Sequence, residues 1–349
     1  MKKYLNTIQF AVLFVAFLLS ACDTDIESEV IQESESKSEA YYQNLRDYKN
    51  TDHAICFGWY AGYTSESSPS LGLHFTGLPD SMDIVSLWSV VPCNDTAYAT
   101  TTGPYNQFYL PTAYKEMNYI REVKGTKVVM CKICRIGSTT YPETEAGIEA
   151  YAMHLVKCVY LNDLDGLDLD YEPEGDWLQG EYFTKFVEIL GNYLGPKSNT
   201  DKLLIVDFYS QRPPEETEPY VDYFVRQCYG TRSAANLQTK YDAISSWCPP
   251  EKFVATEQMG WYWENGGLKY TEADGNTVDS WGNPLYSVIG MARWNPTQGR
   301  KGGFGGFYFE YEYNTTRPAN QSLGDIESTP IPYYSLRRGI QEQNPAAAD

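Results

Sequence analysis

The sequence predicts an α/β protein made of a single (β/α)8 TIM barrel, and three observations carry this prediction. The chain has 349 residues, a length that one large barrel can occupy. Apolar residues make up 42% and charged residues 21% of it, as in ordinary globular domains. Eight short apolar runs, rich in β-branched and aromatic residues, recur at intervals long enough for helices. Eight repeats fit a barrel better than a doubly wound sheet of about five or six strands.

The eight runs define the predicted strands in chain order. They cover residues 54–63, 83–91, 127–137, 164–172, 202–210, 221–230, 252–263 and 303–313. The last run is rich in glycine and is the least regular. Apolar residues three and four positions apart predict helices at residues 145–161, 180–194 and 284–294. In a barrel of this kind, functional side chains are expected at the C-terminal ends of the strands.

The fourth run carries the strongest chemical signal. It reads Leu-Asp-Gly-Leu-Asp-Leu-Asp-Tyr-Glu and ends at Glu172. Because side chains alternate along a strand, Asp168, Asp170 and Glu172 share one face, which we expect to point into the barrel. Carboxylates so close together in a confined interior cannot all ionise cheaply, so a proton should be retained near neutral pH. A retained proton is what a general acid needs.

The same letters would also suit a half-exposed edge strand with a solvated acidic face. The wider stretch favours a catalytic interpretation, because Asp165-Gly-x-Asp-x-Asp-x-Glu172 resembles the D-G-x-D-x-D-x-E motif of glycoside hydrolase family 18. That family places its motif on the fourth strand of a (β/α)8 barrel, which is where this stretch falls. In strand order, the resemblance extends from residue 54 to about residue 315.

The resemblance implies a retaining glycosidase without an enzyme nucleophile, in which the substrate's own 2-acetamido group attacks the anomeric carbon. Glu172 would protonate the glycosidic oxygen, Asp170 would orient the acetamido group, and Asp168 would tune Asp170 from below. The family also places a Tyr within M-x-Y at the end of its sixth strand. Tyr229 matches that position, and Gln227 replaces the Met. The substrate would therefore carry an N-acetylhexosamine at the cleaved bond.

The eighth run separates branches of the family. Chitinases usually place a Trp there beneath the reacting sugar, whereas this run offers Phe and Tyr but no Trp. The short interval between the seventh and eighth runs leaves no room for the insertion domain that deepens many chitinase clefts. The chain therefore looks more like the bacterial, Bacteroidetes-like endo-β-N-acetylglucosaminidases of the F and H type, which cut the chitobiose core of N-linked glycans. The alternatives are a chitinase and a surface glycan-binding lipoprotein on the same barrel.

Aromatic content is high, at 15% of the chain with 30 Tyr and 8 Trp. Aromatic faces stack on sugar rings, while carboxylates and amides bind the hydroxyl groups. The residues predicted to contact substrate are the following side chains at the ends of predicted strands: Trp59, Asp207, Tyr209, Gln227, Trp261, Trp263 and Tyr308.

Charge and histidine content exclude other classes of partner. With 27 basic and 46 acidic residues, the formal net charge of −19 repels nucleic acids. The three His residues are scattered and give no metal-ligand spacing. We expect no cofactor and no metal. The family resemblance implies N-linked glycans or glycoproteins as partners, and we also expect a monomer.

Residues 1–21 are predicted to be a lipoprotein signal peptide. Two Lys precede an apolar run that ends in Leu-Ser-Ala-Cys, which resembles a bacterial lipoprotein signal with Cys22 as the acylated residue. A flexible acidic tether over 22–50, the barrel over 51–340 and a disordered end over 341–349 would follow. The acidic residues after Cys22 resemble the surface-export signal of Bacteroidetes lipoproteins, whereas in a proteobacterium Asp23 would indicate retention in the inner membrane. We expect a protein held in the outer membrane by its lipid and exposed at the cell surface.

Seven Cys remain after Cys22, an odd number that does not suggest a complete disulfide framework. Cys131 and Cys134 form a C-x-x-C within a predicted strand. Residues three apart in a strand face opposite sides at about 10 Å, which is too far for a disulfide. We therefore expect buried free thiols.

Overall fold

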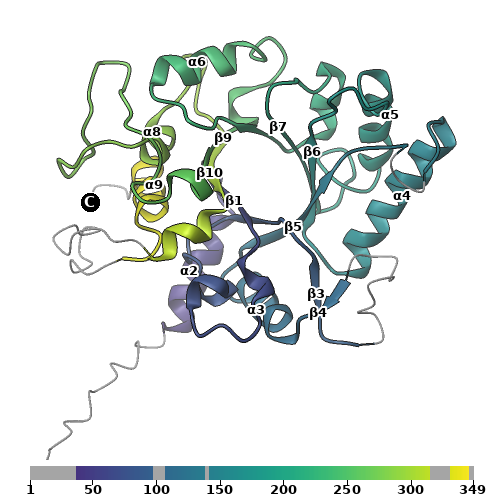
Figure 1. Cartoon of the computed structure of the whole chain (residues 1–349), viewed down its shortest axis with the longest axis horizontal. Helices are drawn as coiled ribbons and strands as arrows, with labels where there is room; N and C mark the ends of the chain where they lie inside the picture. Colours follow the sequence, from purple (N-terminus) through teal and green to yellow (C-terminus); the bar gives the residue numbers. More distant parts are fainter. Residues whose placement is uncertain (1–36, 97–106, 138–140, 315–330, 346–349) are drawn as a thin grey trace, which may run out of the picture. The chain divides into compact units, whose positions relative to one another are not determined.

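A computed structural model describes residues 37–96, 107–137, 141–314 and 331–345. Eight parallel strands close into a barrel, and β1 completes the ring by pairing with both β2 and β10 (Figure 1). The barrel strands are β1 Ile55–Tyr60, β2 Ile84–Leu87, β5 Lys127–Ile133, β6 Gly166–Tyr171, β7 Leu203–Phe208, β8 Tyr223–Gln227, β9 Phe253–Gln258 and β10 Gly303–Phe307. Each of the eight predicted strands is confirmed, and with them the single (β/α)8 barrel.

Helices lie around the outside of the ring (Figure 1). Among the described residues, the α-helices are α2 Glu39–Lys49, α3 Pro111–Glu122, α4 Glu145–Leu161, α5 Glu181–Leu190, α6 Ala234–Asp242, α7 Met259–Tyr262, α8 Ser287–Arg293 and α9 Tyr334–Gln343. The three predicted helices correspond to α4, α5 and α8. Between β7 and β8 the chain forms the 3-10 segment Glu215–Tyr220 in place of an α-helix.

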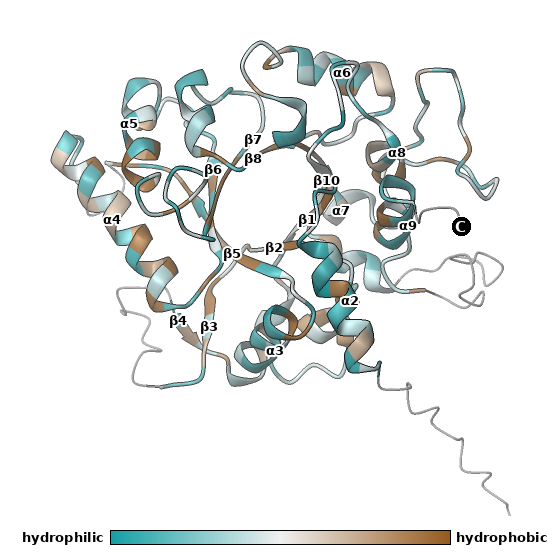
Figure 2. Ribbon diagram, turned by 180° about the vertical axis from the view of Figure 1, so that it is seen from behind, coloured by the Kyte–Doolittle hydropathy of each residue, from teal (hydrophilic) through white to brown (hydrophobic). Residues whose placement is uncertain are grey.

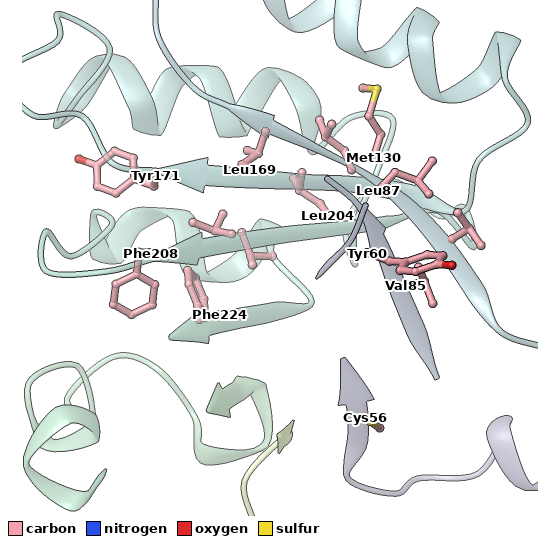
Figure 3. Close-up of a cluster of buried hydrophobic side chains, with 14 of the residues drawn as sticks. Cys56, Tyr60, Val85, Leu87, Met130, Leu169, Tyr171, Leu204, Phe208 and Phe224 are labelled. Carbon is pink, nitrogen blue, oxygen red and sulfur yellow. The ribbon is translucent and has the colours of Figure 1, made fainter. Parts of the chain in front are cut away.

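The strands form because their residues alternate between two hydrophobic layers. Outward side chains such as Leu167 and Leu169 join the core between strands and helices, and inward ones such as Phe57 and Ile205 fill the barrel. Figure 3 shows outward side chains of six strands: Cys56, Tyr60, Val85, Leu87, Met130, Leu169, Tyr171, Leu204, Phe208 and Phe224. In Figure 2 the strands β2 and β6 carry hydrophobic colour, whereas much of α9 is hydrophilic.

The eighth strand is rich in glycine because its neighbour comes very close. Phe57 of β1 is the register partner of Gly305. A Cβ atom at Gly305 would lie 1.8 Å from the carbonyl oxygen of Phe57, which is far inside van der Waals contact. Glycine at this position is therefore a condition for closing the barrel.

Some predicted strands end sooner than expected. After β9 the chain turns directly into α7, and after β10 it enters the 3-10 segment Phe309–Asn314. The apolar and aromatic residues beyond these strand ends belong to the turns at the rim. The apolar runs therefore extend past the strands, and residue composition alone did not show where the strands end. Two short parallel strands, β3 Val91–Cys93 and β4 Gln107–Tyr109, were not predicted at all.

Two predicted domain boundaries differ from the structure. The predicted tether over 22–50 ends in helix α2, whose last residue Lys49 donates from Nζ to the carbonyl oxygen of Met82 at 2.6 Å. The predicted disordered end over 341–349 begins inside α9, where Gln343 Nε2 donates to the carbonyl oxygen of Ala54 at 2.7 Å. In both places long polar side chains bind backbone carbonyls, and such anchoring leaves no apolar pattern in the sequence.

The predicted signal peptide over 1–21, Cys22 and the first part of the tether lie outside the described residues. In the part of the chain that the structure describes, no helix is both long enough and apolar enough to span a bilayer.

The seven described cysteines are free thiols, and six of them are buried. Cys131 packs against the inward cluster, while Cys134 lies in the outward core. The prediction that these two face opposite sides as free thiols is confirmed, but Cys131 is only partly buried, whereas a buried thiol was expected.

Candidate active site

Three buried aspartates meet inside the barrel toward the C-terminal ends of the strands. Asp168 and Asp170 lie on β6, and Asp207 lies on β7 as the register partner of Asp170. Their exposed fractions are 0%, 3% and 1%, respectively. The structure therefore confirms that the predicted acidic face of the fourth strand points inward, and it adds an acid from the next strand.

These aspartates hold protons more tightly than ordinary carboxyl groups. Burial raises the pKa of Asp168 to about 6. Burial, followed by the charges of Glu172 and Asp168, raises the pKa of Asp170 to about 8. Burial and the charges of Asp168 and Asp170 hold the pKa of Asp207 well above its usual range. The cluster retains a proton at neutral pH, as the sequence predicted.

Hydrogen bonds fix Asp168 and Asp207. Asp168 Oδ2 accepts from Trp59 Nε1 at 2.8 Å and from Ser86 Oγ at 2.7 Å. Gln227 Nε2 donates to Asp207 Oδ1 at 2.9 Å. The other oxygens of the two carboxyl groups, Asp168 Oδ1 and Asp207 Oδ2, are buried without a donor from another residue. A proton shared between these two aspartates satisfies both oxygens.

The only cation-binding arrangement found in the described part of the chain belongs to this cluster. Cys131, Asp168 and Asp207 each offer one ligand atom, and these atoms lie within 4.8 Å of one another. Burial raises the pKa values of the Cys131 thiol and of both carboxyl groups. Protons would therefore compete with any metal ion for these atoms at neutral pH.

Glu172 lies immediately beyond the end of β6 and is half-buried. Arg135 Nη2 donates to the backbone carbonyl oxygen of Glu172 at 2.9 Å and forms an ion pair with Glu174 at 2.8 Å. The backbone of Glu172 is thus anchored at the rim. Glu172 follows Asp168 and Asp170 at intervals of two residues along the chain.

Tyr229 follows β8 on the inward face, two residues after Gln227. Its ring lies roughly parallel to those of Tyr209 and Phe307, and the centroid of each of these rings is 6.3 Å from that of Tyr229. Burial and then the charges of Asp207, Asp170 and Glu172 raise the pKa of Tyr229 well above its usual value. The hydroxyl therefore stays protonated and can donate a hydrogen bond beside the acids.

The predicted contact residues occupy different places. Trp261 on α7 is 72% exposed and Tyr209 is 49% exposed, so both present faces at the rim. Tyr308 is half-buried at the end of β10, with its ring 4.1 Å from that of Phe307. Trp263 packs against the outward core.

Trp59 and Asp207 differ from the others, because both are about 1% exposed. They lie in the barrel interior and interact with the acid cluster, and they do not present a surface to solvent.

Two residues of the site were not singled out from the sequence. Ser86 Oγ donates to Asp168, and Arg135 donates to the backbone carbonyl oxygen of Glu172. Strand alternation would have found Ser86, since it is the one polar residue on the inward face of β2. No sequence signal marks Arg135, because its role depends on how two loops meet.

A hollow of about 220 Å³ lies where the end of β2, β5 and α4 meet. Its lining includes Trp88, Cys131, Lys132 and His154. Cys131 is the residue that this hollow shares with the acid cluster, and none of the three aspartates is among its lining residues.

The barrel and the row of acids on its fourth strand define the class of protein, which is a glycoside hydrolase. Residues 40–305 match the family described as the TIM-barrel domain of endo-β-N-acetylglucosaminidase EndoS. The match covers well over half of the chain, and the protein belongs to this family.

Individual proteins are similar to this chain in sequence or in fold. The chain is 28% identical over 328 residues to endo-β-N-acetylglucosaminidase F2 of Elizabethkingia meningoseptica, covering 89% of this chain and 90% of the relative. A selenomethionine variant of BT1044 has the same fold, with a TM-score of 0.68, 22% identity and coverage of 88% and 93%. The apo endo-β-N-acetylglucosaminidase of Cordyceps militaris gives a TM-score of 0.61, 24% identity and coverage of 88% and 97%.

Proposed function

We propose that the protein hydrolyses the GlcNAc-β-1,4-GlcNAc core of N-linked glycans, with Glu172 as the general acid and base. The observation that carries the proposal is the row of acids on β6, in which protonated Asp170 lies one inward position below Glu172 at the rim. The relative F2 is named as an endo-β-N-acetylglucosaminidase. A variant of the Cordyceps militaris enzyme was solved in complex with fucosyl-N-acetylglucosamine-Asn, and this supports an N-glycan substrate.

In the first step, the carboxylic acid of Glu172 gives its proton to the glycosidic oxygen. The acetamido carbonyl oxygen of the substrate attacks the anomeric carbon, the bond to the leaving oxygen breaks, and a cyclic oxazolinium ion forms. Asp170 accepts a hydrogen bond from the acetamido N–H, and Tyr229 donates one to the acetamido oxygen. Both hold the attacking group in line with the anomeric carbon.

In the second step, the Glu172 carboxylate takes a proton from a water molecule whose oxygen attacks the anomeric carbon. The oxazolinium ring opens, and the released sugar keeps its original configuration. Glu172 ends the cycle protonated, as it began.

The test is mass spectrometry of glycans released from a high-mannose and from a complex N-glycoprotein. The wild-type protein should release glycans that bear a single reducing-end GlcNAc. Glu172→Gln should reduce this release by about 1,000-fold or more, because it removes the transferable proton but keeps the side-chain shape. The matched control is Glu188→Gln on the exposed side of α5, which should behave as wild type.

Other outcomes would decide against the proposal. Cleavage of chitin oligosaccharides without N-glycan release would show a chitinase. Retention on a glycan column without any turnover would show a glycan-binding protein. Undiminished release by Glu172→Gln would refute the role assigned to Glu172.

We also propose that Cys22 carries the lipid that attaches the protein to the outer membrane, facing outward. The support is the Leu-Ser-Ala-Cys sequence after an apolar run and the acidic residues that follow it. Metabolic labelling with a fatty acid analogue should label the wild-type protein and not Cys22→Ala. Digestion by protease added to intact cells tests the outward orientation.

A further inference from the structure

We infer that Glu257 is a positioning residue for Tyr229, because its buried carboxylate fixes the turn that carries the tyrosine. This inference rests on the role proposed above for Tyr229. It adds a residue that touches neither the substrate nor the acid cluster.

Glu257 lies on β9 and is 0% exposed. Its Oε1 accepts hydrogen bonds from the backbone N–H of Gly230 at 2.7 Å and of Gln258 at 2.8 Å. Its Oε2 accepts from Ser287 Oγ at 2.5 Å. Three donors converge on one carboxylate, which offsets part of the cost of burying it.

The contact with Gly230 falls within a tight turn. Thr231 N donates to the carbonyl oxygen of Cys228 at 3.2 Å, so residues 228–231 form a four-residue turn after β8. Gly230 is the third residue of this turn and has φ +67°, as a type II turn requires. Tyr229 is the second residue, and its side chain projects from the corner of the turn.

The bond from Glu257 therefore acts on the orientation of Tyr229. The amide N–H of Gly230 belongs to the peptide plane that joins it to Tyr229, so anchoring this N–H fixes the backbone angle ψ of Tyr229. That angle sets how the turn directs the tyrosine ring toward Tyr209 and Phe307. Without the anchor, the turn could rotate and displace the hydroxyl from the acetamido oxygen.

The anchor is itself held rigidly. Ser287 lies at the start of α8, and its Oγ accepts a hydrogen bond from Leu268 N at 3.0 Å. Glu257 thus joins the turn after β8 to the end of β9 and to the N-terminus of α8. A displacement of about 1 Å of a positioned group can cost about 100-fold in rate, so a rigid anchor has catalytic value.

The test is a double-mutant cycle with Glu257→Ala and Tyr229→Phe, measured on an N-glycopeptide. Glu257→Ala should lower kcat about 10- to 100-fold while KM changes less than about 3-fold. Glu257→Gln, which keeps one acceptor oxygen for the two backbone amides, should restore most of kcat. In the Tyr229→Phe background, Glu257→Ala should lower kcat by less than about 3-fold more.

Independent, multiplicative losses in the double mutant would overturn the inference, as would a Glu257→Ala variant with wild-type kcat. Wild-type activity of Tyr229→Phe alone would instead refute the proposed role of Tyr229. If circular dichroism shows that Glu257→Ala does not fold, the cycle is run with Gly230→Ala, whose added Cβ strains the turn at φ +67°. Gly230→Ala should lower kcat and should lose that effect when Tyr229 is replaced.

Discussion

Asp170 is held in its protonated form by the barrel, and this has a consequence for stability. An unfolded chain would ionise this carboxyl group near its usual pKa of 3.8, whereas the folded protein ionises it at about 8. Between these values the folded state binds more protons than the unfolded state. The free energy of unfolding therefore falls as the pH rises through this window.

Asp170→Asn should accordingly stabilise the protein above pH 4 while abolishing glycan release. The variant does not titrate at this position, so its gain in Tm over wild type should grow from pH 4 to pH 8, reaching a few degrees. Differential scanning calorimetry at several pH values measures this gain. Asp201→Asn, which changes an exposed acid, is the control and should show no such trend. A gain that is the same at every pH would contradict the shifted pKa.

The sequence could predict which acids of the fourth strand share a face, because strand periodicity alone decides it. It could not predict that Asp207 joins Asp168 in sharing a proton, because this depends on the register between β6 and β7. It also could not separate Trp59, which is buried, from Trp261, which is exposed. Both are Trp near strand ends, and only the packing distinguishes them.

At the scale of elements, each barrel strand was predictable because its apolar, β-branched run can be recognised in the sequence without any knowledge of tertiary contacts. The strand ends were not, since they are set by where the neighbouring strand stops pairing. Helix α2 was not predicted from the sequence because its apolar residues are few. A polar side chain, Lys49, attaches its end to the barrel by binding a backbone carbonyl oxygen. The missed β3 and β4 are three residues each, too short for a periodic pattern.

Gly305→Ala should destabilise the barrel by at least about 3 kcal/mol, because the new methyl group would force β1 away from β10. Gly175→Ala is the comparison variant, because it adds a methyl group where there is open space. Gly175 has φ +87° but no atom within 4 Å of an added Cβ, so only the backbone conformation is penalised, by about 1–2 kcal/mol. Urea unfolding of both variants measures the difference. Equal destabilisation would show that close packing between β1 and β10 is not the constraint.

At the scale of the whole molecule, net charge affects which glycans approach the site. The formal charge of −19 repels negatively charged glycans over a range that salt shortens, with a Debye length of about 10 Å at 0.1 M. Neutral glycans feel no such repulsion. The protein should therefore distinguish sialylated from asialo substrates partly through long-range electrostatics.

The ratio of kcat/KM for an asialo glycopeptide to that for its sialylated counterpart should exceed one at about 20 mM salt and shrink at about 300 mM. Steady-state kinetics at both salt concentrations measures the ratio, and the asialo substrate alone controls for general salt effects. A ratio that does not respond to salt would place the discrimination in short-range contacts.

The pairing of β1 with β10, which closes the barrel, also determines when folding can finish. β1 needs β10 as its second neighbour, and the carbonyl oxygen of Ala54 just before it accepts a hydrogen bond from Gln343 at the end of α9. β1 is the first barrel strand to be synthesised, but it can complete its hydrogen bonds only after β10 and α9, near the end of the chain, have been synthesised. Until then one edge of the growing sheet stays open and can pair with other chains. Nascent or truncated chains that lack β10 should thus depend on chaperones, and completion of the ring is a late step in biogenesis.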